Sequence, residues 1–569
     1  MNSYRRVLGI EGTAWAASAA VYDSEADSTV IESDPYQPES GGIHPREAAE
    51  HMHAAIPRVV ETALDHAREL AAANGGKDSD GDPVEPPIDA VAFSRGPGLG
   101  PCLRIVATAA RALAQTLDVP LVGVNHMVAH LEIGRHTANF DDPVCLNASG
   151  ANAHLLAYRN GRYRVLGETM DTGVGNAIDK FTRHVGWSHP GGPKVERAAA
   201  DGEYVDLPYV VKGMDFSFSG IMSAAKAEYD EGTPVEDVCV GLQETIFAML
   251  TEVSERALSL TGSAELVLGG GVGQNARLRE MLSEMCAARG ASFHAPEPRF
   301  LRDNAGMIAV LGAKMAEAGQ TLPVADSRID PDFRPDEVVV GWREDAGRSI
   351  AATEPPERIV DGAEAVVTVD REAGVVTKRR QPKSYRHPAL DERLRRERTA
   401  IEARLTSQAR RVGVPTPVLC DVDPFESTIT FASVGDRDLR DALSVDRVRA
   451  VGRHLAAIHD AGFVHGDPTT RNVRVRGPGP ERSTDGEGSD STASTPGPTY
   501  LIDFGLGYHT DHVEDYAMDL HVFDQSLVGT ANEPEPLRDA FLEAYEEAGD
   551  ERVLDRLADI EGRGRYVGE

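Results

Sequence analysis

Two histidines at a metal-binding spacing are the first residues that suggest chemistry. His126 and His130 are four positions apart, so on a helix both imidazoles lie on one face and can reach one ion. Asp303 offers a third, harder ligand, and two imidazoles with one carboxylate suit iron or zinc with open coordination positions. Spacing alone leaves a second interpretation open, in which the pair is a chance or capping feature.

Three turns of small residues follow apolar segments and suit anion binding. Glycine lets backbone N–H groups approach a phosphate, and the third turn opens a predicted helix whose N-terminus favours negative charge. None is a P-loop or a dinucleotide-binding motif, and a purely structural role would explain each turn taken singly. Together they indicate a duplicated actin/Hsp70-type fold with a ligand in its central cleft. The turns span residues 9–13, 149–152 and 269–275.

A second group of residues has the order of a kinase catalytic centre. Asp467 and Asn472 have catalytic-loop spacing, and Asp503 opens an Asp-Phe-Gly sequence. In that order Asp467 orients the nucleophile or takes its proton, while Asn472 and Asp503 hold magnesium. Lys378 ends an apolar strand and suits pairing with ATP phosphates, and Glu402 on the following helix is its expected partner.

The kinase pattern is incomplete in two places. The loop before Lys378 lacks a full Gly-x-Gly-x-x-Gly motif, and after Gly505 few residues precede the next helix, with no Ala-Pro-Glu. Little chain remains for an activation loop or a peptide-docking platform. The residues expected to contact ATP in the loop are Asp361, Gly362, Ala363, Glu364 and Ala365.

More than one domain must position these groups, since 569 residues exceed the usual single domain of roughly 100–200. Short apolar runs, glycine turns and alanine-rich stretches indicate α/β architecture. We expect an actin-like domain over 1–325, a proline-marked linker over 326–357, and a two-lobed kinase-like domain over 358–569. Polar, aperiodic segments at 74–87 and 477–498 are predicted insertions, the second of them disordered.

The net charge of -33, from 91 acidic and 58 basic residues, argues at first against nucleic acid. An acidic, lysine-poor surface is also typical of proteins in multimolar salt, where the Debye length is about 3 Å or less. We therefore expect halophilic adaptation, with RNA contacts through local arginines. In the alternative interpretation these arginines form i,i+4 ion pairs on a solvated helix. The candidates are Arg393, Arg395, Arg396, Arg398, Arg563 and Arg565.

Other features lead us to expect a cytoplasmic protein. Five scattered cysteines without a Cys-x-x-Cys pair disfavour disulfides and a zinc ribbon. Arg5 and Arg6 precede an apolar stretch like a secretion signal, but Glu11 interrupts it, and residues 7–10 and 18–22 fit two strands around a turn. No apolar run approaches the roughly 20 residues of a membrane span, so no membrane contact is expected.

Five motifs in order resemble the universal TsaD/Kae threonylcarbamoyltransferase family. The resemblance implies transfer of a threonylcarbamoyl group from threonylcarbamoyl-AMP to the exocyclic amine of the adenosine 3′ of the anticodon, in tRNAs reading ANN codons. It makes His126, His130 and Asp303 ligands of an iron or zinc ion. The motifs lie at residues 42–49, 96–100, 125–130, 191–193 and 216–220, within a resemblance from residue 7 to about 313.

The same resemblance assigns a binding site for the adenylate. Asp179 and Glu196 suit ribose hydroxyls, and a Lewis-acid metal would polarise the acyl carbonyl and stabilise its oxyanion. One position departs from the family, because Asn147 stands where a metal-binding tyrosine is usual. Its amide oxygen is a weak substitute, or the ligand is lost. The implied residues are Asn147, Ala148, Ser149, Gly150, Ala151, Asp179, Gly192, Glu196 and Asn275.

The C-terminal region is similar to the small RIO-like kinase of the KEOPS complex, through residues 383–391, 398–404 and 563–566. This implies ATP and magnesium as ligands, and an atypical Ser/Thr kinase or ATPase that supports tRNA modification. The implied partners are tRNA, other KEOPS subunits and the adenylate-forming enzyme. The leading hypothesis is thus a bifunctional tRNA-modification enzyme.

Three alternatives remain at this point. The first domain fits a metal-free ATPase of the sugar-kinase or chaperone type. It fits a metalloprotease less well, since no glutamate follows His126 as the zincin motif requires. The whole chain is alternatively a signalling Ser/Thr kinase with an actin-like regulatory module.

Overall fold

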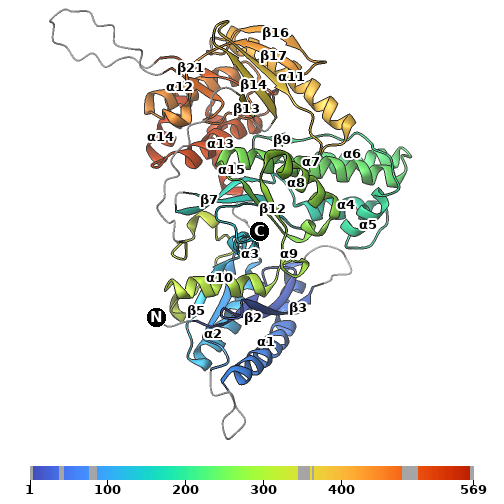
Figure 1. The fold of residues 1–569 in the computed structure, drawn as a ribbon, viewed down its shortest axis with the longest axis vertical. Helices are drawn as coiled ribbons and strands as arrows, with labels where there is room; N and C mark the ends of the chain where they lie inside the picture. The colour runs from blue at the N-terminus through green and yellow to red at the C-terminus, as the bar shows by residue number, and fades with distance from the viewer. Residues whose placement is uncertain are drawn as a thin grey trace, which may run out of the picture. The chain divides into compact units, whose positions relative to one another are not determined.

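In a computed structural model the chain folds into two compact units (Figure 1). The first comprises residues Met1–Val210 and Phe216–Ile350, and the second Val211–Asp215 and Ala351–Glu569. The structure describes residues 4–36, 44–75, 86–150, 152–159, 161–343, 359–361, 364–476 and 497–563. Ala151, Gly362, Ala363 and most of both predicted insertions lie outside these ranges. Both units contain helices and strands, which confirms the predicted mixed α/β architecture.

The first unit contains two five-stranded sheets of the same topology. In each, the first strand is central, the second and third add antiparallel on one side, and the fourth and fifth add parallel on the other. The first sheet has the order β3 (Ser28–Pro35), β2 (Ala16–Asp23), β1 (Arg6–Glu11), β4 (Ala90–Gly96), β5 (Leu121–Asn125). The second has the order β12 (Ser292–His294), β11 (Glu265–Gly269), β6 (Val144–Ala148), β7 (Ala153–Arg159), β8 (Arg162–Glu168). The two predicted N-terminal strands are confirmed as β1 and β2.

Helices cover these sheets. Helix α1 packs on β2 and β3, while α7 packs on β6, β7 and β11. The short strands β9 (Val211–Lys212) and β10 (Asp215–Phe216) form a separate ribbon. The helices are α1 (Pro45–Gly75), α2 (Gly100–Leu117), α3 (His126–Ala138), α4 (Val174–His184), α5 (Gly192–Ala199), α6 (Ser219–Asp230), α7 (Val235–Thr261), α8 (Ala276–Arg289), α9 (Pro298–Leu301) and α10 (Ala305–Glu317), with 3₁₀ turns η1 (Gly271–Gln274), η2 (Val324–Asp326) and η3 (Pro335–Glu337).

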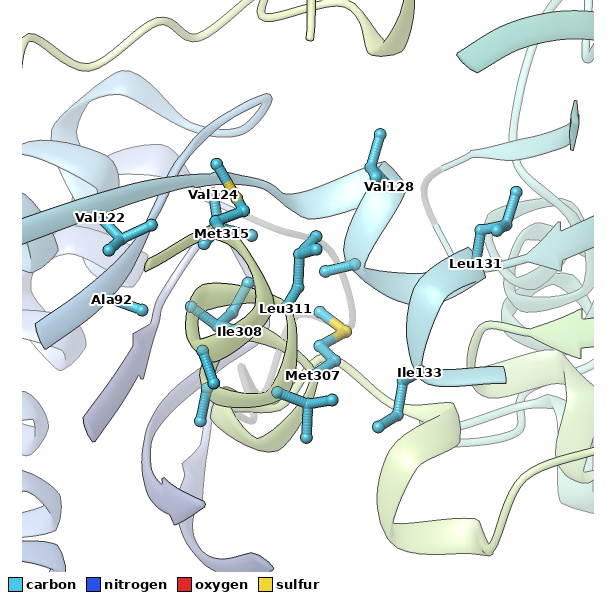
Figure 2. Packing of buried hydrophobic residues seen from close by; sticks show 14 of the residues in the cluster. Ala92, Val122, Val124, Val128, Leu131, Ile133, Met307, Ile308, Leu311 and Met315 are labelled. Carbon is cyan, nitrogen blue, oxygen red and sulfur yellow. The ribbon is translucent and has the colours of Figure 1, made fainter. Parts of the chain in front are cut away.

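Helices α3 and α10 share one core with both sheets. Figure 2 shows this packing, in which Leu311 and Met315 of α10 lie with Val124 of β5 and Val128 of α3. Eleven of the thirteen residues of α10 are buried, which explains why the helix is apolar on all sides. Gly9 of β1 permits this contact, because a Cβ there would lie 2.4 Å from a carbonyl oxygen of α10. The core thereby fixes α3 between the two sheets.

The first unit continues beyond position 325, where the sequence placed its end. Val338 belongs to the same core, and the ring of Trp342 stacks on Tyr163 with centroids 6.1 Å apart. Arg343 lies 4.0 Å over the ring of Tyr158 and 3.6 Å from buried Glu132. Residues up to Arg343 therefore pack as part of this unit.

The second unit has an antiparallel sheet followed by a mainly helical part. The sheet has the order β13 (Ile359–Asp361), β14 (Ala365–Asp370), β15 (Val375–Arg380), β17 (Thr428–Ala432), β16 (Leu419–Asp423), and α11 (Pro388–Arg411) packs on it. The remaining elements are β18 (Arg437–Asp438), η4 (Leu439–Asp441), α12 (Val445–Asp460), β19 (Phe463–Val464), β20 (Val473–Val475), β21 (Thr499–Leu501), β22 (Tyr508–His509), α13 (Val513–Thr530), α14 (Glu535–Glu546) and α15 (Glu551–Arg563). A core cluster joins α11 to α12, α13, α14 and α15.

The structure also bears on the cysteines and on membrane spans. All five cysteines are free, four of them buried, which confirms the absence of disulfides. Among the described residues, no helix has the length and apolar character needed to cross a lipid bilayer.

Candidate functional site

The paired histidines lie at the start of α3, whose position the N-cap residue fixes. Oδ1 of Asn125 accepts hydrogen bonds from the N–H groups of Met127 and Val128, both at 3.0 Å. This is the usual role of an N-cap side chain, and it starts the helix at His126. One helical turn later, His130 is buried beside His126, with ring centroids 4.8 Å apart.

The side chains of His126, His130 and Asp303 meet at one point, which spacing alone left open. Nε2 of each imidazole lies 3.4 Å from Oδ1 of Asp303, and the three ligand atoms lie within 4.8 Å of one another. Bonds of about 2.0–2.1 Å to a tetrahedral ion would place neighbouring ligand atoms about 3.3 Å apart. Nδ1 of His130 is buried and lacks a hydrogen-bond partner among the described residues, while its Nε2 faces Asp303. These residues therefore fit a metal ion.

The charges of this trio are strongly coupled. Burial disfavours protonated His126, but the carboxylates of Glu11 and Asp303 outweigh burial and raise its pKa to about 10. Burial opposes ionisation of Asp303 as well, yet His126 and then His130 hold the pKa of its carboxyl far below the usual range. Burial lowers the pKa of His130, which favours the neutral imidazole that ligates metals.

Glu11, at the end of β1, holds the second nitrogen of His126. Its Oε2 lies 3.1 Å from Nδ1 of His126, its Oε1 accepts from the N–H of Thr13 at 2.7 Å, and its side chain is fully buried. A carboxylate at Nδ1 keeps a proton there. The lone pair that a metal requires is then on Nε2, the nitrogen that faces Asp303.

Asn147, where the family pattern leads to a tyrosine, lies on β6 beside the trio. A Cβ built on Gly269 would lie 3.3 Å from Oδ1 of Asn147 and 3.5 Å from the Cβ of His130. Its Nδ2 is 3.4 Å from Nε2 of His154, which stays neutral because burial, then the nearby histidine charges, lower its pKa to about 3. The amide thus directs its nitrogen to His154. Its oxygen is buried and has no partner among the described residues.

The turn after β6 is held by its own polar groups and by α4. Oγ of Ser149 accepts from the N–H of Asn152 at 3.0 Å, and the Ser149 N–H donates to the Asn152 carbonyl at 2.9 Å. A Cβ on Gly175 would lie 2.7 Å from the Cα of Gly150. Because Gly175 is in the first turn of α4, the positive end of that helix lies directly at the turn. Ala148 ends β6 just before it.

Asp179 of α4 joins two further predicted residues. Its Oδ1 accepts from the N–H of Gly191 at 2.7 Å, and its Oδ2 lies 3.1 Å from Nδ1 of His189. Gly192 begins α5 immediately afterwards. The carboxylate is thus oriented by the loop that leads into α5.

Glu196 and Asn275 meet at the start of α8. Oε1 of Glu196 accepts from the N–H of Ala276 at 2.8 Å. Oδ1 of Asn275 caps the same helix, and its Nδ2 donates to Oε1 of Gln243 at 3.3 Å. The structure therefore places both residues beside η1, in the third glycine-rich turn of the sequence.

In the second unit, Lys378 of β15 lies between two carboxylates. Its Nζ is 3.1 Å from both oxygens of Glu402 on α11 and 2.6 Å from Oδ1 of Asp503. Arg380 also pairs with Glu402 at 2.6 Å and donates to Oγ1 of Thr399 at 3.2 Å. Alternate residues of a strand point to the same face, so both cations hold Glu402.

The catalytic loop is ordered by hydrogen bonds. Nδ2 of Asn472 donates to Oδ2 of Asp467 at 3.0 Å and to its carbonyl at 2.8 Å. Asp519 of α13 accepts from the N–H groups of His465 at 2.6 Å and Gly466 at 2.8 Å. These two contacts fix the backbone immediately before Asp467.

Asp503 has a backbone conformation that is uncommon outside glycine. Its φ is 65°, in the left-handed region, and strain of this kind gathers at functional sites. Burial opposes ionisation of its carboxyl, but the charges of Lys378 and Arg380 outweigh it and lower the pKa. The side chain therefore stays charged and directed at Lys378.

The predicted ATP loop is described in part. Asp361 ends β13 and Ala365 begins β14, and these two strands are neighbours in the sheet. Glu364 accepts from Nη1 of Arg398 at 2.5 Å. This carboxylate therefore links the loop to α11, a contact that the sequence did not suggest.

The arginine cluster on α11 is engaged inside the second unit. Arg395 pairs with Asp391 at 2.7 Å, and Arg396 lies 4.1 Å over the ring of Phe425. Arg393 pairs at 3.5 Å with the residue four positions later, Glu397. These contacts favour the alternative interpretation of an ion-paired helix over an RNA contact. The side chains of Arg563 and Arg565 lie outside the described residues.

Three positioning residues had not been predicted from the sequence. Arg380 was detectable, since it follows Lys378 by two positions on one strand and must share its face. Glu11, a buried charge beside a glycine turn, gave a weaker signal. Asp519 gave none, because it reaches the catalytic loop from a helix more than fifty residues later.

A metal-type trio in one unit and a kinase-type arrangement in the other define a two-site protein, and comparisons with known proteins agree. Residues 26–310 match the family described as tRNA N6-adenosine threonylcarbamoyltransferase. The chain is 70% identical over 564 residues to the probable bifunctional tRNA threonylcarbamoyladenosine biosynthesis protein of Halobacterium salinarum, covering 99% of this chain and 98% of that one. It is 49% identical to the protein of that name from Methanospirillum hungatei, covering 99% of each.

The chain therefore belongs to the family of bifunctional tRNA threonylcarbamoyladenosine biosynthesis proteins. The resemblance seen in the sequence motifs is confirmed. A solved Rio2 kinase from Chaetomium thermophilum matches with 16% identity and a TM-score of 0.23, over 37% of this chain and 70% of that one.

Proposed function

We propose that the first unit transfers the threonylcarbamoyl group of threonylcarbamoyl-AMP to the exocyclic amine of the adenosine 3′ of the anticodon, in tRNAs reading ANN codons. The observation that carries this proposal is the meeting of His126, His130 and Asp303 beside a glycine-rich turn. The repeated sheet topology supports an actin/Hsp70-type fold for this unit. Its domain corresponds to the predicted range 1–325, extended by the packed residues up to Arg343.

Each group of residues has a separate task in this transfer. His126, His130 and Asp303 would hold an iron or zinc ion, with the Asn147 amide oxygen nearby. The ion, when bound, supplies a Lewis acid for the acyl carbonyl. The turn at Ser149, with the positive end of α4 behind it, suits the phosphate. The remaining residues orient the rest of the adenylate, namely Asp179, Gly192, Glu196 and Asn275.

The second unit, assigned to the predicted range 358–569, acts as an atypical Ser/Thr kinase or ATPase in support of the transfer. Lys378 pairs with ATP phosphates, Asn472 and Asp503 hold magnesium, and Asp467 orients the nucleophile. The expected partners are tRNA, other KEOPS subunits and an enzyme that supplies the adenylate. This role depends on the ordered catalytic loop and on the paired lysine.

Mass spectrometry of tRNA nucleosides tests the transfer. Purified protein, the other KEOPS subunits and an active adenylate-forming enzyme are incubated with tRNA, ATP, threonine and bicarbonate in multimolar KCl. We expect threonylcarbamoyladenosine to accumulate. Its absence, when the adenylate itself is detected in the same mixture, would contradict the proposal.

A further inference from the structure

An aromatic side chain from the first sheet lies at the turn of the second sheet. Trp15 is in the connection between β1 and β2, where its carbonyl accepts from the N–H of Tyr36 at 2.7 Å. A Cβ built on Gly150 would lie 3.6 Å from the indole Nε1 of Trp15. The indole nitrogen is therefore next to the turn that the proposed function assigns to the phosphate.

The indole N–H of Trp15 is buried and has no hydrogen-bond partner among the described residues. An indole nitrogen is only a donor, and buried donors in folded proteins are nearly always paired. The group beside Gly150 that would complete the pairing must therefore be an acceptor. An anionic oxygen is the strongest acceptor for such a donor.

The indole ring is also held at a fixed angle. It lies parallel to the imidazole of His189, with 7° between the planes and centroids 5.7 Å apart. Nδ1 of that imidazole lies 3.1 Å from Oδ2 of Asp179, which the proposed function assigns to the adenylate and which suits its ribose hydroxyls. Trp15 thus connects the phosphate turn to the ribose-binding carboxylate through two side-chain contacts.

We propose that Trp15 binds the adenylate directly, with its indole N–H donating a hydrogen bond to an anionic oxygen at the Ser149 and Gly150 turn. The inference rests on the proposed adenylate site and adds a residue that the sequence motifs did not assign. The acyl adenylate carries two anionic groups, the phosphate and the threonyl carboxylate. AMP carries only the phosphate, and adenosine carries neither.

Calorimetric titration with AMP and with adenosine tests this assignment. The titrations use the full chain with the substitution Lys378→Met, which is chosen to suppress nucleotide binding in the second unit. Trp15→Phe keeps the ring and removes the N–H, so we expect AMP to bind about tenfold more weakly while adenosine binding is unchanged. An unchanged AMP affinity but weaker binding of the intact acyl adenylate would assign the hydrogen bond to the carboxylate.

Trp342→Phe is the matched control. Its indole N–H is also buried and unpartnered among the described residues, but its ring stacks on Tyr163 in the core, so AMP affinity should not change. Equal losses for AMP and adenosine in Trp15→Phe would overturn the hydrogen bond in favour of a packing role. Unchanged binding of AMP, adenosine and the acyl adenylate would overturn the proposal outright.

Fluorescence gives a second, independent measurement. The chain has three tryptophans, so Trp187→Phe with Trp342→Phe leaves Trp15 as the sole indole. AMP should shift its emission and reduce its quenching by acrylamide, whereas no response to saturating AMP would contradict the contact. Failure of the parent protein to bind either nucleotide would instead overturn the adenylate site itself, and the proposal with it.

Discussion

The two candidate sites differ in how fully they satisfy their buried polar groups. In the first unit, Nδ1 of His130, the amide oxygen of Asn147 and the indole N–H of Trp15 are buried without a hydrogen-bond partner among the described residues. In the second unit, Lys378 contacts both Glu402 and Asp503. The first site thus has several unused donors and acceptors, whereas the charged groups of the second pair mainly with one another, with Nε of Arg380 also lacking a partner among the described residues.

This difference predicts different responses to ligands. A site with unpartnered buried groups gains hydrogen bonds or metal ligands on binding, so its ligand should stabilise the first unit strongly. In the second unit, magnesium must compete with Lys378 for Asp503. Binding there exchanges one ion pair for another, and a smaller change in stability is expected.

The largest expected effect comes from removing a metal ligand. His130→Ala leaves His126 and Asp303 alone, so we expect metal affinity to fall by more than the roughly 10–100-fold typical of losing a residue behind a ligand. Metal content after dialysis, measured by elemental analysis, checks this. His53→Ala, at an exposed histidine of α1, should bind metal normally. Full metal occupancy in His130→Ala would show that His130 is not a metal ligand, and would contradict the contrast drawn between the two sites.

Disrupting the paired site should affect stability instead. Glu402→Ala leaves two buried cations without their shared carboxylate, which is expected to cost about 3–5 kcal/mol. Lys378→Met should cost less, because Arg380 still pairs with Glu402. All three tryptophans are in the first unit, so tryptophan fluorescence does not report on the second unit. Hydrogen exchange of peptides from α11 is therefore the suitable measurement. Equal protection from exchange in both variants would show that the ion pair between Arg380 and Glu402 does not stabilise the second unit when Lys378 is absent.

A smaller effect is expected behind the metal ligands. Glu11→Gln preserves the shape of the side chain but weakens the acceptor for Nδ1 of His126, so metal affinity should fall about 10–100-fold. Competition with a chelator of known affinity gives the value. Glu25→Gln, at an exposed surface carboxylate, is the control. If both variants bind metal alike, Glu11 has only a packing role.

Much of this molecule could be predicted from its sequence, because many residues act through local patterns. The pair His126 and His130 is defined by helical periodicity, and the strand of Lys378 by its apolar run. The contact of Asp303 with both histidines depends instead on how α10, which begins two residues later, packs against the first sheet and α3, and no local pattern encodes that packing. The roles of Asp519 and Trp15 were missed for the same reason, since each acts on a segment distant in sequence.

The proposed function assigns two chemistries to two separate sites of one chain. Transfer to tRNA and hydrolysis of ATP should therefore be measured side by side, in multimolar KCl, for wild type, His126→Ala and Asp467→Asn. We predict that His126→Ala forms no threonylcarbamoyladenosine but hydrolyses ATP at the wild-type rate, and that Asp467→Asn loses ATP hydrolysis. Persistence of ATP hydrolysis in Asp467→Asn, or its loss in His126→Ala, would contradict the assignment of the two chemistries to separate sites.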